Sequence, residues 1–196
     1  MMLPPEPGNG RPALRWVPEE LRHITLAFYG ELPSGALDDL LAALSSALAP
    51  HPPLDLRLRG AGVFSARTLW AGVQDQAPST HSRRNGPLAD LMAVCEDAGR
   101  SVGAALGRQE RRRAHLTVAR LRSRTGNHRS SRGARGRHRG QTHDGGEQLD
   151  LLAEALAVYE GPVWTAHEAG LMLSELGAGP GGGPRHQRLG TLPLTG

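Results

Sequence analysis

The stretches LRHITLAFYG (residues 21–30) and RAHLTVARLR (residues 113–122) decide how this chain folds, because both contain His-apolar-Thr-apolar. No other His-x-Thr triplet occurs in the 196 residues. Successive side chains of an extended strand point to opposite faces. The histidine and threonine of each copy therefore share one face, while the apolar residues turn toward a core. His23 and Thr25 form the first such pair, and His115 and Thr117 form the second.

One copy of this pattern would most simply contain a core histidine with satisfied hydrogen bonds, but two copies favour a site where the side chains meet. An imidazole, with an ordinary pKa of about 6.5, can act as an acid or a base at neutral pH. A facing pair can divide the work, so that one histidine deprotonates water and the other protonates a leaving oxygen. The two threonine hydroxyls suit the non-bridging oxygens of a phosphate. The motifs therefore predict hydrolysis of a phosphodiester that needs no metal and no cofactor.

Arg120 follows His115 by five residues and could add a charged clamp on the same phosphate. Strict alternation places Arg120 on the face opposite to His115. The sequence therefore predicts a bend that turns the guanidinium inward.

The basic residues are unevenly distributed along the chain. All 23 Lys and Arg positions are arginine, and residues 108–139 contain twelve of them against one acid, Glu110. The remaining residues carry eleven arginines and eighteen acids. A basic segment on an otherwise acidic protein indicates an anionic partner.

The single cysteine, Cys95, excludes an internal disulfide, and its helical surroundings are typical of a buried structural thiol. Residues 1–10 lack the features of a signal peptide, and no apolar run is long enough to span a bilayer. We therefore expect a cytoplasmic monomer with no membrane contact. His128, His138 and His143 match no standard metal-site spacing, so no metal site is predicted.

The periodicity predicts an α+β protein with one domain over residues 1–196, built as two similar lobes. Irregular structure is predicted over residues 1–13, and a flexible insertion rich in Arg and Gly over residues 123–146. The predicted strands cover residues 14–18, 23–30, 54–58, 68–74, 114–121, 161–177 (as one or two strands) and 188–194, and the predicted helices cover residues 35–50, 87–106 and 147–159. Residues 60–67 are predicted as a connection, and residues 179–186 as a loop.

The paired motifs resemble those of the 2H phosphoesterases. More narrowly, LRWVPEELRHITLAFYGELP (residues 14–33) looks like the first-motif region of the RNA 2′,3′-cyclic phosphodiesterases, the LigT-like or 2′-5′ RNA ligase family. LWAGV, HLTVAR and the tail from GPVWTA onward resemble the same family in the same order. The resemblance implies a bilobal fold with two pseudo-symmetric lobes of antiparallel sheet, helices outside, and the two motifs facing across a central cleft.

The resemblance also implies an activity and a set of roles. The expected reaction cleaves an RNA-terminal 2′,3′-cyclic phosphate to a 2′-phosphate, with 2′-5′ ligation as a side activity. His23 would act as the general acid on the departing 3′ oxygen, and His115 as the general base on water. Thr25, Thr117 and Arg120 would bind the phosphate. Phe28 and Phe64 are candidates to line a nucleoside pocket, and the alternative for each is a plain core position.

Two features depart from the family pattern. The motif LPPEP lies almost at the start, so the family's first strand and first helix are expected to be missing, which would expose sheet edges and apolar surface and lower the stability. The segment 123–146 is longer and more basic than in the family. It is either an arm that captures RNA through its phosphates or a solvated insertion without a role.

Two other functions stay open at this point. A shortened N-terminal lobe that cannot align His23 would leave a non-catalytic RNA-binding protein. Alternatively, the same two-histidine chemistry would act on a small cyclic nucleotide or an ADP-ribose cyclic phosphate.

Overall fold

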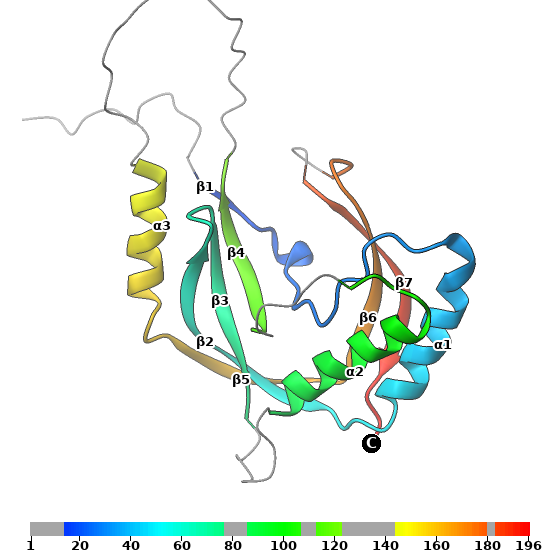
Figure 1. Cartoon of the computed structure of the whole chain (residues 1–196). Coiled ribbons are helices and arrows are strands. Elements are labelled where there is room, and N and C mark those ends of the chain that lie inside the picture. The colour runs from blue at the N-terminus through cyan, green and yellow to red at the C-terminus, as the bar shows by residue number, and fades with distance from the viewer. Residues whose placement is uncertain (1–13, 77–85, 107–112, 123–143, 180–182) are drawn as a thin grey trace, which may run out of the picture.

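The chain folds into two lobes whose sheets lie between outer helices. The computed structural model describes residues 14–76, 86–106, 113–122, 144–179 and 183–196. In Figure 1, α3 (Asp144–Ala155) lies outside one sheet, while α1 (Leu37–Leu48) and α2 (Pro87–Ser101) lie on the outside of the other. Within the described residues, no helix is both long enough and apolar enough to cross a membrane.

Lobe A is a five-stranded antiparallel sheet with α3 on its outer face. Its strand order is β1-β4-β3-β2-β5. The strands are β1 (Leu14–Trp16), β2 (Leu54–Phe64), β3 (Thr68–Asp75), β4 (His115–Leu121) and β5 (Glu160–Ala166). The core between this sheet and α3 contains Leu14, Leu69, Ala119 and Leu149, each at most 5% exposed. This packed face leaves the opposite face of the sheet to carry the site.

Lobe B contains the two-stranded antiparallel sheet of β6 (Glu168–Glu175) and β7 (Arg185–Pro193), packed against α1 and α2. The extended segment 22–32 adds partly buried side chains to the same core, among them Ile24 and Leu26. This confirms that the apolar residues of the first motif turn inward. A short 3₁₀ turn, Ser34–Ala36, leads from this segment into α1.

The helices of lobe B follow from simple sequence patterns. In α1, Leu40, Leu44 and Leu48 recur every four residues and are at most 2% exposed, so they form one buried stripe. The helix α2 begins at Pro87, and the Asp75 carboxylate accepts a hydrogen bond from the Leu88 amide at 3.1 Å. A carboxylate at this position satisfies a free amide and opposes the positive end of the helix dipole.

Cys95 on α2 is buried in the core of lobe B, as predicted for a structural thiol. Burial raises the pKa of the Cys95 thiol to about 12. Burial also raises the pKa of the Tyr29 hydroxyl, which donates a hydrogen bond to the Cys95 carbonyl at 2.9 Å. This hydrogen bond ties segment 22–32 to α2, just beyond the first histidine motif.

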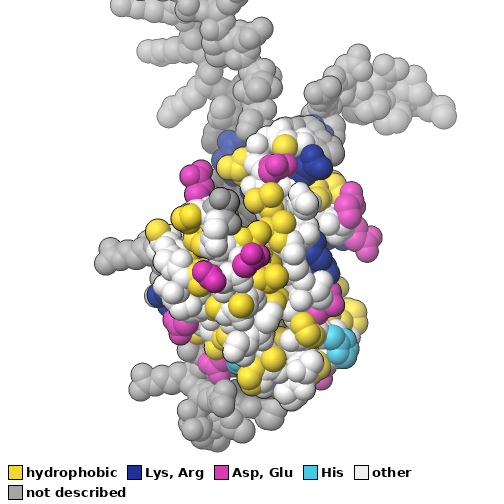
Figure 2. All heavy atoms as spheres, turned by 90° about the vertical axis from the view of Figure 1, so that its right-hand side faces the viewer, with side chains coloured by type: hydrophobic (Ala, Val, Ile, Leu, Met, Phe, Trp, Pro, Cys, Tyr) yellow, Lys and Arg dark blue, Asp and Glu magenta, His cyan; other side chains and the backbone are white. Residues whose placement is uncertain are grey.

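The sheet of lobe B is incompletely covered. Met172 and Leu173 are neighbours on β6 and point to opposite faces, yet they are 44% and 43% exposed. Figure 2 shows hydrophobic side chains spread over the side of the molecule that carries α1, interrupted by acidic groups. Residues 1–13, which bear on the expected loss of the first strand and helix, lie outside the described residues.

Several predicted boundaries are wrong. The prediction of a strand over residues 23–30 fails, because this segment forms only one bridge, Ile24 to Leu116. The strand β2 continues through the predicted connection to Phe64, and α2 ends at Ser101, followed by Gly103 at φ +83°. The structure corrects two further starts: α3 begins at Asp144, inside the predicted insertion, and β7 begins at Arg185, inside the predicted loop. Residues 123–143 of that insertion lie outside the described residues.

Candidate active site

A single backbone bridge brings the two histidine motifs together. Ile24 pairs antiparallel with Leu116 of β4. In this register His23 lies beside Thr117, and Thr25 beside His115, while the bridging apolar residues share the other side. The two copies of the motif, some ninety residues apart in the sequence, thus lie on adjacent chain segments. The expected pairing of two imidazoles and two hydroxyls rests on this contact.

Both imidazoles are held in the same tautomer by their own backbone. The Nδ1 atom of His23 lies 2.9 Å from the Leu21 carbonyl oxygen, and Nδ1 of His115 lies 2.9 Å from the Arg113 carbonyl oxygen. A carbonyl oxygen only accepts, so each Nδ1 must donate its proton. Each Nε2 is then the atom that gains or loses a proton. Such a fixed orientation is what a general acid or base requires.

A β-bulge places Arg120 on the face that carries the second motif. Thr117 pairs with Trp70 and Arg120 pairs with Thr68, with a register shift between these two pairs. Thr68 and Trp70 are two residues apart on β3 and share a face, so Thr117 and Arg120 share that face as well. The extra residue, Val118, supplies the bend that was expected to bring Arg120 to the face of His115. Arg120 is exposed at this position.

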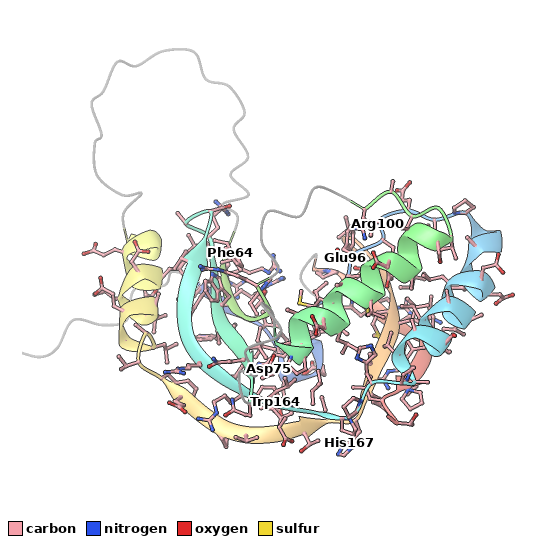
Figure 3. The ribbon with its side chains drawn as sticks, turned by 60° about the horizontal axis from the view of Figure 1, so that its bottom comes forward. Phe64, Asp75, Glu96, Arg100, Trp164 and His167 are labelled. Carbon is pink, nitrogen blue, oxygen red and sulfur yellow. The ribbon has the colours of Figure 1, made fainter. Side chains whose placement is uncertain are left out.

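Two aromatic rings pack beside His115. The rings of Phe64 and Trp70 are stacked with centroids 5.0 Å apart, and the ring of Phe64 meets His115 edge-on at 5.0 Å. Figure 3 shows Phe64 near the end of the β2–β3 hairpin, on the opposite end of β3 from Asp75. Phe64 is 38% exposed, so it offers a partly open aromatic surface next to the second motif rather than a core side chain.

Two glycines make room for this aromatic pair. A Cβ on Gly62 would lie 2.5 Å from the Trp70 ring, so the indole lies directly over the bare backbone of β2. Gly72 pairs with His115, and a Cβ there would lie 2.5 Å from the Arg59 carbonyl oxygen. The Arg59 carbonyl thus fills the space that a side chain on this β3 neighbour of His115 would need.

A third histidine contacts the first motif. The rings of His186, on β7, and His23 meet edge-on with centroids 5.2 Å apart. Burial, with a smaller contribution from the charge of His23, lowers the pKa of His186. This ring contact joins the two-stranded sheet of lobe B to the first motif.

The predicted residues divide into three groups. His23, Thr25, His115 and Thr117 belong to the two segments joined by the bridge, and Arg120 follows on the same face of β4. Phe64 lies against His115, but Phe28 is 71% exposed and belongs to neither core. Within the described ranges, no group of three His, Cys, Asp or Glu side chains is arranged to hold a metal ion.

Sequence reasoning missed Trp70 and His186. Trp70 pairs with Gly62 of β2. The sequence prediction ends this strand before Gly62, so it could not place the indole. His186 was assigned to a glycine- and proline-rich loop, but β7 begins at Arg185 and includes it.

Known proteins match this sequence and this fold. Residues 6–73 match the family model described as LigT like Phosphoesterase, a range that includes His23 and ends before His115. The chain is 36% identical over 113 residues to a protein of Geobacillus stearothermophilus named RNA 2′,3′-cyclic phosphodiesterase. The aligned part covers 56% of this chain and 33% of the relative. It is 33% identical over 73 residues to a protein of the same name from Methanothermobacter thermautotrophicus, covering 35% of this chain and 39% of the relative.

The solved structures with similar folds cover nearly the whole chain. The protein TT0787 of Thermus thermophilus superposes with a TM-score of 0.63 at 21% identity, over 94% of this chain and 84% of that one. Escherichia coli LigT in its apo form superposes with a TM-score of 0.60 at 19% identity, over 94% and 82% of the two chains. At these identities the superpositions establish the fold.

The fold is α+β, with antiparallel sheets between outer helices. Part of the sequence, residues 6–73, thus resembles the LigT-like phosphoesterases, and the fold resembles that of Escherichia coli LigT. The chain spans well under half the length of the curated relatives it matches, 33% and 39%.

Proposed function

We propose that the protein hydrolyses the 2′,3′-cyclic phosphate at the end of an RNA to a 2′-phosphate. The single observation that carries the proposal is the bridge between Ile24 and Leu116, because it joins the two histidine motifs into one site. Two relatives share the name RNA 2′,3′-cyclic phosphodiesterase, and one structure of similar fold is Escherichia coli LigT complexed with 3′-AMP, with a TM-score of 0.58.

The proposed mechanism uses the two free Nε2 atoms. Nε2 of His115 removes a proton from water, and the resulting hydroxide attacks phosphorus in line with the 3′ oxygen. Protonated His23 donates its Nε2 proton to that oxygen as the P–O3′ bond breaks, which leaves the phosphate on the 2′ oxygen. Thr25 and Thr117 donate hydrogen bonds to the non-bridging oxygens, and Arg120 balances their negative charge.

The surroundings of the two histidines suit this division of roles. The rings of Phe64 and Trp70 meet the His115 ring edge-on, with centroids 5.0 Å and 6.3 Å away. His23 is exposed, and the departing nucleoside oxygen can reach it from solvent. Phe64 offers the terminal base a ring to stack on, as expected for a nucleoside pocket.

The test is the identity of the product. RNA ending in a 2′,3′-cyclic phosphate is incubated with the protein in EDTA, and the phosphorus NMR signal of the product is recorded. The proposal expects a 2′-phosphomonoester, formed at the same rate with and without EDTA. A 3′-phosphate, or a rate that EDTA abolishes and a divalent cation restores, would contradict the two-histidine mechanism. The same mixture with a 5′-hydroxyl RNA tests the expected 2′-5′ ligation.

A second candidate is an RNA-binding protein without catalysis. His23 lies outside any strand, and one backbone bridge, at Ile24, joins its segment to β4. In this case a single bridge leaves the His23 imidazole too loosely positioned for proton transfer, while the RNA phosphate still binds to Thr117 and Arg120. Saturable binding of the cyclic-phosphate RNA without any turnover would identify this case. The cytoplasmic, monomeric state stays a prediction, which light scattering and fractionation can check.

A further inference from the structure

Arg15 of β1 lies beside Arg120 on the face of the sheet that carries the second motif. The register pairs Arg15 directly with Arg120, and Leu14 with Leu121. Leu14 is 5% exposed in the core under α3, so alternation sends the next side chain, Arg15, to the opposite face. Two guanidinium groups thus project from neighbouring strands on the catalytic side.

The Arg15 side chain reaches from lobe A to the start of β7. A Cβ added to Gly183 would lie 3.1 Å from one terminal nitrogen of the Arg15 guanidinium, so this group packs against the bare backbone there. Gly183 is itself buried. The contact fixes the guanidinium between the two lobes instead of leaving it extended in solvent, and a fixed cation loses less entropy when it binds an anion.

The position of this arginine pair relative to the first phosphate site is set by the strand. The pair of Arg120 with Thr68 follows the pair of Thr117 with Trp70 by two residues of β3, which is about 7 Å along a strand. This separation is comparable with that of neighbouring phosphates along one nucleic acid strand. On an RNA that ends in a cyclic phosphate, the neighbouring phosphate is attached to the 5′ oxygen of the terminal nucleoside.

We propose that Arg15, on the strand next to Arg120, forms a second phosphate subsite that binds the 5′-phosphate of the terminal nucleotide, while Arg120 stays with the cyclic phosphate. This inference rests on the proposed function for the identity of the substrate. The subsite makes the protein select RNA ends over free nucleoside 2′,3′-cyclic phosphates, which lack the second phosphate. Arginine suits the role because its planar fork binds two phosphate oxygens at once.

The first experiment measures binding and needs no turnover. Calorimetry compares adenosine 2′-monophosphate with adenosine 2′,5′-bisphosphate, which differ only in the 5′-phosphate. A charge-assisted hydrogen bond of this kind is expected to improve binding by about tenfold or more. The wild-type protein should therefore bind the bisphosphate at least about tenfold more tightly, and Arg15→Ala should reduce that ratio to near one while leaving the affinity for the monophosphate unchanged.

Two further variants control the comparison. Arg185→Ala removes the same charge from an exposed position at the start of β7, on the face opposite to His186, and should keep the wild-type ratio. Arg15→Gln keeps much of the length and hydrogen-bonding capacity without the charge, and replaces Arg15→Ala if that variant does not fold. Equal binding of the two nucleotides by the wild type, or a full ratio in Arg15→Ala or Arg15→Gln, would overturn the subsite.

Turnover then separates the subsite from the proposed reaction. Adenosine 2′,3′-cyclic phosphate and its 5′-phosphorylated form are compared by kcat/KM in EDTA. If both are hydrolysed, the 5′-phosphate should raise kcat/KM by about tenfold in the wild type and not in Arg15→Ala. If neither is hydrolysed while the binding ratio holds, the subsite stands and the proposed reaction is wrong.

Discussion

The turn that joins β2 to β3 offers a sharp test of the backbone geometry beside the site. Ser65 and Ala66 occupy the centre of this turn at φ 49° and 51°, and the Arg67 amide donates a hydrogen bond to the Phe64 carbonyl at 2.9 Å. Hairpin turns of this type prefer Asn-Gly, because glycine adopts positive φ without steric cost. A residue with a Cβ loses about 1–2 kcal/mol in that conformation.

Ala66→Gly is therefore expected to raise the free energy of unfolding by about 1 kcal/mol, since it removes the steric cost at one of the two positions. For a chain of this length that corresponds to about 2–4 °C in Tm. Changing Ser65→Asn as well should add a further few tenths of a kcal/mol. Urea unfolding followed by tryptophan fluorescence measures the change, with the slope of the transition unchanged.

Ala42→Gly is the matched control, because the same side chain is removed from an exposed position inside α1. There glycine should lower the free energy of unfolding by about 1 kcal/mol. The two substitutions thus have opposite expected signs. If Ala66→Gly destabilises the protein as much as Ala42→Gly does, the turn does not have the positive φ values on which this reasoning depends.

Three other predictions test the burial of single side chains. The lowered pKa of His186 should appear in an NMR titration as a midpoint below about 6.5, and a midpoint at or above 6.5 would exclude this. Because the pKa of His186 is lower in the folded than in the unfolded chain, the contribution of the neutral imidazole to stability is complete above pH 6.5. That contribution is lost as the pH falls toward the folded pKa. Cys95, at 3% exposure and with a pKa of about 12, should resist a thiol reagent at pH 8 until urea unfolds the chain, whereas labelling of the native protein within minutes would show an open core. The substitution Leu69→Ala, at a position with 0% exposure, should lower the free energy of unfolding by about 2–5 kcal/mol. Leu151→Ala, at 60% exposure on α3, should lower it far less, and equal losses would place the core of lobe A elsewhere.

Local sequence patterns predicted which side chains share a face, but not what lies beside them. Alternation correctly separated His23 and Thr25 from the apolar residues that enter the core of lobe B. It failed to show that residues 23–30 form no strand, because a strand needs a partner along its length, and only Ile24 has one. Pairing is a long-range property that a short apolar run does not encode.

Arg120 shows how a local irregularity changes a face. Two-residue alternation puts it opposite to His115, and the bulge at Val118 reverses that placement. Nothing in HLTVARL marks the bulge, since it arises from the register against β3. The prediction that a bend turns Arg120 inward came from the chemistry of the site, which needs a cation beside the phosphate, and the register supplies that bend.

His186 was missed for a different reason. Its surroundings, GPGGGPRH, are typical of a loop, and polar residues that follow a run of glycine and proline give little strand signal. The strand forms there because β6 offers a partner, with His186 opposite Ser174. Only this pairing brings the third imidazole to His23, so the contact could not be read from either segment alone.

The central claim is that the two bridged motifs act as one acid–base pair. The most direct test is turnover of an RNA ending in a 2′,3′-cyclic phosphate, in EDTA, by the wild type, His23→Ala, His115→Ala and His167→Ala. His167 is exposed between β5 and β6, away from Phe64 in Figure 3, and serves as the matched control. The account predicts turnover by the wild type and His167→Ala, and a loss of at least about a hundredfold in each of the other two variants. Turnover that survives either His23→Ala or His115→Ala at the wild-type rate would contradict it.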